Sequence, residues 1–356
     1  MATIQDIKNA TGVSCSAISR ILNNDPTFSV SDATRRKVVE AARKLDYHKY
    51  KKSSAALKKV LGGEARHLHP NDTLGILQWF SREQELEDTY YLYIRHGIED
   101  YCLSHAIHLV RSVKSDPDYI EALQGVDALI CIGKFHQKDL QSLKKISKHI
   151  LLLDMETEDS FFSSITLDYE ETMIEVLEDL CALGHHRIGF LGGKEYIASR
   201  TTYPDRRKEV FETFAKEHGI EYQDYLYIDR FSSRSGYDMA RKLIHQCQVN
   251  HRPLPSAIMA ASDPIAMGAM RALQDAGYSI PEDISIVGFD DTEGSAYTRP
   301  ALSTIHTPAY HMGEYGASVL STLLCQKDAP SMKMKLSCSY VKRETVAPVP
   351  VGEETR

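Results

Sequence analysis

Eight short apolar runs alternate with helical patterns between residues 73 and 287, and this alternation constrains the fold more than any other feature of the sequence. Between the runs, apolar residues recur at the three- and four-residue spacing of an amphipathic helix. Uninterrupted apolar strands are buried on both faces, as in a parallel sheet that is covered by helices on each side. The runs are residues 74–77, 107–110, 128–132, 150–153, 188–191, 226–228, 257–260 and 284–287.

The number of strand–helix units indicates two sheets rather than one. Roughly eight units over about 270 residues exceed what one sheet of a doubly wound α/β domain comfortably holds. We therefore predict two doubly wound parallel-sheet subdomains. Because ligands bind at the carboxyl ends of parallel strands, the cleft between the subdomains is the expected site. The clearest helical patterns are residues 92–103, 170–183, 204–215 and 264–276.

The first fifty residues read instead as a small three-helix module. Thr3 and Asp6 have the spacing of a capping box, and Gly12 is suited to end the first helix in a left-handed conformation. Ser14 is a good N-cap for a second helix, and a third begins near Ser31. Two short helices joined by a Gly turn form a helix-turn-helix. The second helix would bury Ile18, Ile21 and Leu22.

Charge separates this module from the rest of the chain. Residues 1–62 hold 12 Lys and Arg against 5 Asp and Glu, a net charge of +7, whereas residues 63–356 carry −14. A basic module on an acidic body is the electrostatic pattern of a DNA-binding head. The alternative is a helical cap that binds nothing, because helical hairpins with a Gly turn are common.

The chain resembles the LacI/GalR family of bacterial transcription repressors over nearly its whole length. In the head, the resemblance is carried by Thr3-Ile4-Gln5-Asp6-Ile7, Gly12-Val13-Ser14 and Ile18-Ser19-Arg20-Ile21-Leu22-Asn23. In the body, it is carried by residues 182–189, 260–269, 280–291 and 300–305. The family's body looks like a periplasmic sugar-binding protein, which agrees with the two subdomains that the apolar runs predict.

The resemblance implies a domain organisation. It divides the chain into a helix-turn-helix DNA-binding domain (1–47), a hinge (48–71), an effector-binding and dimerisation domain (72–346) and a flexible tail (347–356). The first subdomain would comprise residues 72–166 and 303–330, and the second would comprise 167–302 and 331–346. The hinge would form a short helix on the operator, although its composition alone is that of a solvated linker.

The resemblance also assigns DNA contacts. Cys15 and Ser16 would face base edges, and Arg20 would reach a guanine or a phosphate. Leu57 is the candidate that wedges into the minor groove, with Leu61 as the second choice. The remaining contacts, which set register mainly through phosphates, are assigned to Thr3, Ser14, Ser19, Asn23 and Thr34.

Six residues are carried over as effector contacts: Tyr90, Tyr91, Arg207, Phe231, Ser262 and Asp290. The Arg207 guanidinium would grip hydroxyls or a carboxylate, and the Asp290 carboxylate would accept from ligand hydroxyls. Ser262 stands where many relatives have Asn, so its contact would be shorter. The alternatives are a surface Arg, a loop-capping Asp and aromatic rings that belong to the core.

Other patterns argue against enzymatic chemistry. The run Gly189–Gly193 lacks the GxGxxG spacing of a nucleotide site, and no His, Cys or acid cluster has metal-ligand spacing. We find no nucleophile elbow or triad, so we expect no catalytic residue, no metal and no cofactor. Seven scattered cysteines, no signal peptide and no long apolar run favour a cytoplasmic, nucleoid-associated protein without membrane contact.

These observations predict a homodimeric repressor that binds double-stranded operator DNA and responds to a small sugar. Within the family, residues 84–99 and 231–237 look most like repressors of β-galactosidase and galactose operons, so galactose or a galactoside is the expected inducer. One alternative is a carbon-catabolite regulator of the same family with a phosphocarrier protein as corepressor. The other is a soluble sugar-binding protein whose head is only an interaction module.

Overall fold

The computed structural model describes residues 4–14, 72–198, 201–324 and 329–349, together with positions 17, 18, 20, 30, 34, 37, 38 and 41. The chain divides into two compact units, residues 1–65 and 66–356.

The amino-terminal unit begins with the helix that its sequence predicts, α1 (Ile4–Thr11). Gly12 follows with a φ of +71°, and its N–H donates to the Lys8 carbonyl at 2.8 Å, so the predicted glycine stop is confirmed. The Ser14 hydroxyl accepts from the Ala17 N–H at 3.3 Å, which is the expected N-cap. The core of the unit is made by Ile7, Ile18 and Val38, with Val13, Val30 and Ala41 packed against them.

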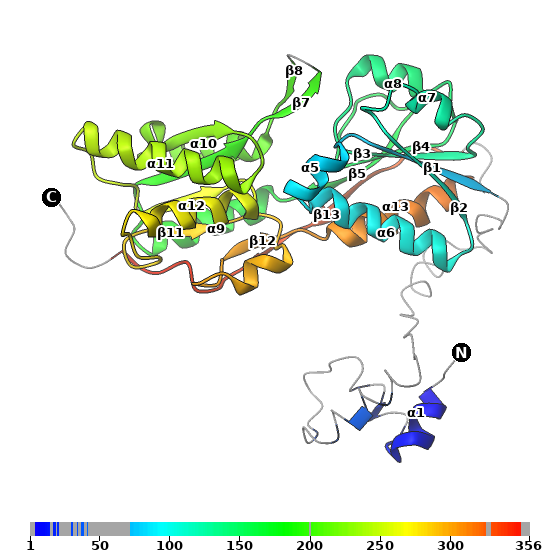
Figure 1. The fold of residues 1–356 in the computed structure, drawn as a ribbon, viewed down its shortest axis with the longest axis horizontal. Coiled ribbons are helices and arrows are strands. Elements are labelled where there is room, and N and C mark those ends of the chain that lie inside the picture. The colour runs from blue at the N-terminus through cyan, green and yellow to red at the C-terminus, as the bar shows by residue number, and fades with distance from the viewer. Residues whose placement is uncertain are drawn as a thin grey trace. The chain divides into compact units, whose positions relative to one another are not determined.

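The larger unit contains two parallel sheets, each the centre of one lobe (Figure 1). The first lobe has a six-stranded sheet in the order β13-β5-β4-β3-β1-β2. Its strands are β1 (Thr73–Gln78), β2 (His108–Val113), β3 (Ala128–Ile132), β4 (Ile150–Leu153), β5 (Ser163–Asp168) and β13 (Lys333–Ser337). Its helices are α5 (Arg82–Glu87), α6 (Tyr90–Ser104), α7 (Tyr119–Ala122), α8 (Gln137–Leu143) and α13 (Ala309–Leu324).

The second lobe has a four-stranded sheet in the order β11-β10-β6-β9. Its strands are β6 (Ile188–Gly193), β9 (Leu226–Asp229), β10 (Ala257–Ala260) and β11 (Ser285–Val287). Its helices are α9 (Glu170–Ala182), α10 (Arg206–Glu217), α11 (Ser233–Val249) and α12 (Asp263–Asp275), with short 3₁₀ turns at η1 (Gln223–Tyr225) and η2 (Glu293–Tyr297). All eight predicted apolar runs are therefore strands of the two parallel sheets, and the doubly wound α/β prediction is confirmed.

Helices cover both faces of each sheet. In the first lobe, α6 and α13 lie over one face and α7 and α8 over the other (Figure 1). In the second lobe, α9 and α10 pack into one apolar cluster and α11 and α12 into another. The pair α6–α13 approaches closely because Gly97 and Gly313 lie at the crossing: a Cβ on Gly313 would stand 1.8 Å from the Ile94 carbonyl oxygen.

Three segments connect the lobes. The chain leaves the first lobe between β5 and α9, returns along β12 (Thr304–His306), and leaves again along β14 (Ser339–Val341), which pairs antiparallel with β12. The predicted third crossing near residue 330 is wrong, because β13 pairs with β5 and belongs to the first sheet. Met334 and Leu336 pack against the core there, so residues 333–337 form an edge strand before the chain crosses.

The carboxyl-terminal segment also differs from the prediction of a flexible tail that begins at residue 347. The Ala347 carbonyl lies 3.0 Å from Nε2 of the buried His185, and its N–H donates to the Ser285 hydroxyl at 3.1 Å. The Val349 N–H donates to the Leu183 carbonyl at 2.9 Å. Residues 347–349 are therefore fixed on the second lobe, because strand-end and helix-end groups there need partners.

Candidate ligand-binding cleft

A pocket lies between the two lobes at the carboxyl ends of their strands. It leaves about 880 Å³ free of atoms, its open mouth included, which is within the range of small-molecule sites. Five of the six predicted effector residues line it: Tyr90, Tyr91, Arg207, Phe231 and Asp290. The fold thus brings together side chains that are up to two hundred positions apart in the sequence.

Arg207 is held in one orientation by the second lobe. Asp205 caps α10, and its carboxylate accepts from both the backbone N–H and Nε of Arg207, the latter at 2.8 Å. The guanidinium also donates from Nη1 to the Ala261 carbonyl at 2.8 Å and stacks between the rings of Phe231 and Phe289, at 4.9 and 5.2 Å. Burial alone lowers the pKa of Arg207, but nearby carboxylates keep that pKa above its ordinary value.

The first lobe contributes a polar floor whose groups satisfy one another. Lys134 follows β3 and Asp154 follows β4, and Lys134 Nζ lies 2.6 Å from Asp154 Oδ2. The Tyr91 hydroxyl donates to the same oxygen at 2.8 Å. Asp154 adopts a φ of +64°, a conformation that Asp tolerates better than most residues. This ion pair places a charge-neutral, hydrogen-bonded surface under the ligand space.

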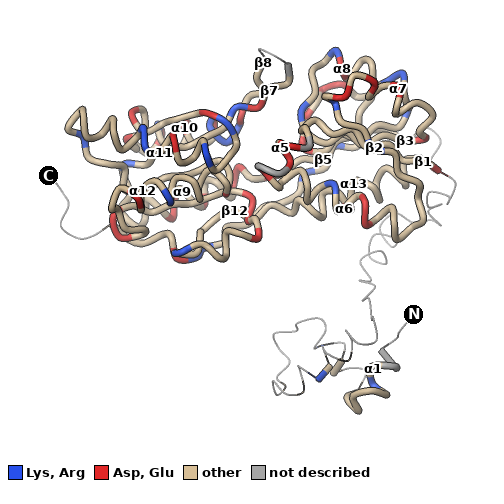
Figure 2. Tube along the Cα trace, in the orientation of Figure 1, with Lys and Arg blue, Asp and Glu red and all other residues tan. Residues whose placement is uncertain are grey.

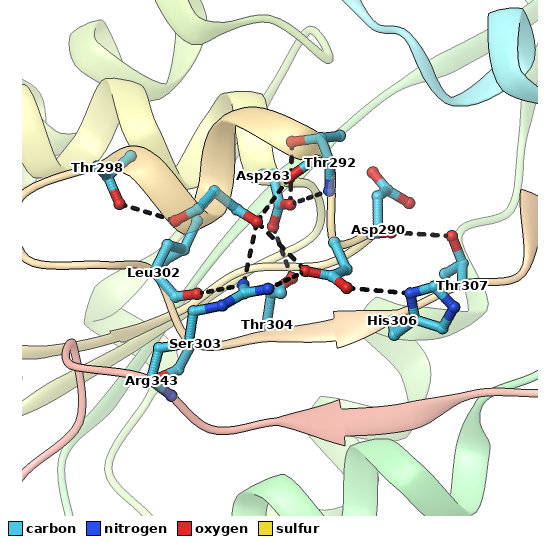
Figure 3. Close-up of polar contacts among 12 residues, drawn as sticks. Asp263, Asp290, Thr292, Thr298, Leu302, Ser303, Thr304, His306, Thr307 and Arg343 are labelled. Atoms are coloured by element: carbon cyan, nitrogen blue, oxygen red, sulfur yellow. Dashed lines mark hydrogen bonds and ion pairs between the residues drawn. The ribbon is translucent and has the colours of Figure 1, made fainter. Parts of the chain in front are cut away.

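Tyr90 and Asp290 are different, because their polar groups are left without partners. The Tyr90 hydroxyl is buried and accepts or donates no hydrogen bond among the described residues. Asp290 is 8% exposed, and its backbone is bound to Ile305 and Thr307 while no hydrogen bond reaches its carboxylate within the described part of the chain (Figure 3). Burial raises the pKa of Asp290 well above its ordinary value. Buried groups in this state are suited to a hydroxyl partner from a bound ligand or from water.

A hairpin of β7 (Glu195–Ala198) and β8 (Thr201–Tyr203) follows β6 and reaches the first lobe. Glu195 Oε1 lies 3.4 Å from the Tyr91 hydroxyl, and the Trp79 indole N–H donates to the Tyr196 carbonyl at 3.2 Å. Burial raises the pKa of Glu195 to about 7. The hairpin therefore adds a protonatable side chain to the pocket and joins the two lobes beside it.

Ser262 does not line the pocket, although we expected it to contact the effector. It is 1% exposed and forms the N-cap of α12, where its hydroxyl accepts from the Ile265 N–H at 3.4 Å. The helix that starts directly after β10 needs this cap, so the side chain points into its own helix rather than toward the ligand space.

Sequence reasoning missed nine charged residues of the pocket, among them Lys134, Asp154, Glu195 and Asp205. Two of them had a usable signal, because Lys134 and Asp154 come just after predicted apolar strands, at the edge where ligands bind. Asp205 had another, since an Asp directly before a helical pattern is a preferred N-cap. Glu195 had none, because the hairpin that carries it has no apolar pattern of its own.

In the head, three of the predicted DNA contacts fall on described residues. Ser14 caps the second helix, Arg20 is helical and exposed, and Thr34 is helical and half-buried. The other predicted contacts, namely Thr3, Cys15, Ser16, Ser19, Asn23 and Leu57, lie outside the described residues, as does the predicted hinge.

The rest of the body offers few competing sites. In Figure 2, acidic and basic positions are interspersed along the helices and loops of both lobes. Among the described residues, no three His, Cys, Asp or Glu side chains are grouped as metal ligands. Of the helices in the described ranges, none combines the length and the apolar character that a membrane crossing requires.

Comparison with known proteins gives this architecture a family. Residues 3–49 match the family described as "Bacterial regulatory proteins, lacI family", and residues 177–346 match a "Periplasmic binding protein-like domain". The chain is 32% identical over 335 residues to the HTH-type transcriptional regulator GalR of Streptococcus thermophilus, covering 93% of this chain and 96% of that protein. It is 30% identical over 358 residues to the regulator GanR of Bacillus subtilis (strain 168), covering 99% and 98%.

A solved structure agrees on the fold. The lac repressor dimer bound to operator and an anti-inducer matches 97% of this chain and 99% of its own, with a TM-score of 0.64 at 24% identity. The identity to GalR over nearly the full length of both chains, together with the two domain matches, shows the family. The chain belongs to the LacI/GalR family of bacterial transcriptional regulators, and it is not an enzyme.

Proposed function

We propose that this protein is a homodimeric repressor of a sugar-utilisation operon in the bacterial cytoplasm, and that galactose or a galactoside in the cleft releases it from its operator. One observation carries the proposal: the buried Arg207 guanidinium, in contact with two aromatic rings, shares the pocket with the Asp290 carboxylate and the Tyr90 hydroxyl, neither of which has a hydrogen-bond partner among the described residues. Aromatic faces bind the apolar side of a sugar ring, and such polar groups bind its hydroxyls.

The charge of the pocket supports an uncharged effector. Seven Asp and Glu side chains but only four Lys and Arg line it. The two buried cations, Lys134 and Arg207, are already paired with Asp154 and Asp205. A phosphate would lie among unpaired carboxylates without a free cation in the described lining, and this costs binding free energy. A neutral sugar meets no such cost, which favours it over a phosphorylated one.

The coupling between sugar and DNA would run through the lobes. Since both lobes contribute to the pocket, a bound ligand changes the free energy of their relative arrangement. In a dimer that change alters the spacing of the two heads on a pseudo-palindrome. A coupling of about 1–3 kcal/mol is typical of such linkage.

The test is DNA binding by the full chain, measured as fluorescence anisotropy of a labelled family-type palindrome with a central CpG. Galactose, lactose and glucose are added in turn. We expect galactose or lactose to weaken DNA binding at least tenfold, which corresponds to about 1.4 kcal/mol. Glucose is the matched control, because it differs from galactose at one hydroxyl.

Other outcomes separate the alternatives. Tight DNA binding that no sugar changes, but that a phosphocarrier protein strengthens, would indicate the catabolite regulator instead. Substituting Arg20 by Ala should weaken specific DNA binding, because this exposed side chain lies on the helix assigned to the major groove. Sugar binding without any sequence-dependent, salt-sensitive DNA binding would leave only a sugar-binding protein.

A further inference from the structure

A second cavity lies behind the first. It leaves about 760 Å³ free of atoms, its mouth included. Its walls come from the loop after β11, the strand β12 and the start of α13, together with two tyrosines of α6. The lining residues are Tyr90, Tyr93, Asp290, Asp291, Thr292, Glu293, His306, Thr307, Pro308, Ala309, Tyr310 and His311. None of the predicted effector contacts other than Tyr90 and Asp290 belongs to it.

Tyr90 and Asp290 are also the only two residues that line both cavities. The Tyr90 hydroxyl is buried without a hydrogen-bond partner among the described residues, and no hydrogen bond reaches the Asp290 carboxylate in Figure 3. In the effector pocket, Lys134, Arg207 and Tyr91 are already hydrogen-bonded to protein groups, and one buried oxygen of Asp205 is not. Two side chains that can still accept a ligand partner therefore stand at the boundary between the cavities.

The chemistry of the second cavity resembles that of a sugar subsite. Asp291 forms an ion pair with Arg343, at 2.5 Å, and Nδ1 of His306 lies 3.0 Å from its other carboxylate oxygen. This contact uses one ring nitrogen of His306 and leaves the other for a ligand. No Lys or Arg is among the residues that line the cavity, and the rings of Tyr93 and Tyr310 supply apolar faces. A phosphate or carboxylate would find no cation here, whereas a neutral ring with hydroxyls fits.

We propose that the two cavities form one extended site, in which the effector is a galactoside of at least two units with its linkage at Tyr90 and Asp290. The second unit occupies the second cavity, against Tyr93 and His306. This inference rests on the proposed function, and it narrows the effector from any galactose-containing sugar to one with a second ring or a comparable aglycone. A glycosidic oxygen at the boundary can accept from the Tyr90 hydroxyl, and a sugar hydroxyl there can donate to the Asp290 carboxylate.

The experiment compares one-ring and two-ring sugars on the full chain by isothermal titration calorimetry. Galactose, lactose and melibiose are the probes, since the two disaccharides carry galactose in β and α linkage. We expect at least one disaccharide to bind tenfold or more tightly than galactose. His306→Ala and Tyr93→Ala should each remove most of that advantage while changing the affinity for galactose less than twofold.

Two controls make the result specific. Tyr101→Ala removes the same half-buried side chain from the same helix, away from both cavities, and should leave the ratio of affinities unchanged. Arg207→Lys should weaken all sugars together. Two results would overturn the extended site but leave the proposed function in place. One is that galactose binds as tightly as both disaccharides, and the other is that His306→Ala weakens the binding of galactose and disaccharide equally. If no sugar binds the wild type, the proposed function fails, and the extended site fails with it.

Discussion

The two lobes prepare their sides of the cleft in opposite ways. In the first lobe, Lys134 and Tyr91 both bind Asp154, so this cluster needs no ligand, and the Tyr90 hydroxyl is the exception that has no partner among the described residues. In the second lobe, no hydrogen bond reaches the Asp290 carboxylate in Figure 3, and one oxygen of Asp205 is buried without a partner. The charged groups of the first lobe are thus paired without a ligand, and those of the second lobe are only partly paired.

This difference suggests that the two lobes contribute differently to stability and to ligand binding. A completed network holds its side chains in fixed rotamers, so the first lobe provides a preorganised surface. Unsatisfied groups destabilise the ligand-free protein, and a ligand that satisfies them recovers that free energy. We therefore expect substitution of the paired Asp154 to act mainly on stability and substitution of the unpaired Asp290 to act mainly on ligand response.

The largest effect is expected at Arg207. Arg207→Met leaves Asp205 buried without a cation, which should cost about 3–5 kcal/mol of stability. Sugar binding should fall below detection, because the guanidinium between Phe231 and Phe289 is lost. Urea unfolding and calorimetry measure both. Arg234→Met, which removes an exposed helical ion pair with Asp238, is the control and should change stability by less than about 0.5 kcal/mol.

Substituting a glycine at a helix crossing should give the next largest loss of stability, and the loss should be similar in the two lobes. A Cβ at Gly313 would stand 1.8 Å from the Ile94 carbonyl oxygen, and one at Gly268 would stand 1.9 Å from that of Ser233. Each Gly→Ala change forces backbone apart and should cost about 1–3 kcal/mol in urea unfolding. Gly316→Ala, one turn along α13, meets only side-chain methyls, those of Leu153 at 3.0 and 3.1 Å and one of Leu151 at 3.4 Å, and should cost clearly less. Equal costs at Gly313 and Gly316 would contradict this account of the crossing.

Neutralising one carboxylate in each lobe should give effects of opposite sign. Asp154→Asn removes the partner of Lys134 and should destabilise the protein by about 1–3 kcal/mol. Asp290→Asn removes a buried carboxyl group whose ionised form is disfavoured by burial, tolerates the φ of +110°, and should raise stability by about 0.5–2 kcal/mol while weakening sugar binding. Thermal denaturation with and without sugar measures both quantities. If the two substitutions shift the melting temperature in the same direction, the comparison between the lobes is wrong.

The smallest effect is a pH dependence at the hairpin. Burial raises the pKa of Glu195 from an ordinary value of 4.5 to about 7. Between those values the folded protein holds a proton that the unfolded chain releases, so this side chain lowers stability as pH rises from about 4.5 to about 7. In urea unfolding at several pH values, Glu195→Gln should gain stability relative to the wild type over that interval and no further above it. A difference that does not change with pH would contradict the raised pKa.

The sequence predicted the strands well where they are apolar on both faces, and it failed where they are not. The eight predicted strands have mainly apolar runs, even where they are edge strands such as β2, β9 and β11. The two missed strands lack such a run, because β5 begins with two serines and β13 alternates Lys with apolar residues. This is why the third crossing between the lobes was placed too early.

For the site, the resemblance identified single residues but not their relations. Arg207 and Asp290 were found from local motifs, whereas the Lys134–Asp154 pair depends on β3 and β4 being neighbours. Sheet order is a non-local property that a single sequence does not state. The prediction that Ser262 contacts the effector differs from the structure for the opposite reason. It was based on a position shared with the family, whereas the side chain is used locally as the N-cap of α12.

The contact between Trp79 and the hairpin gives the protein a built-in optical probe. Trp79 is the only tryptophan in the chain, and its indole N–H donates across the cleft to the Tyr196 carbonyl. Indole emission moves to longer wavelength when the ring becomes more hydrated. The emission spectrum of the unlabelled protein therefore follows this one junction, so the opening and closing of the cleft can be timed directly in a stopped-flow fluorimeter.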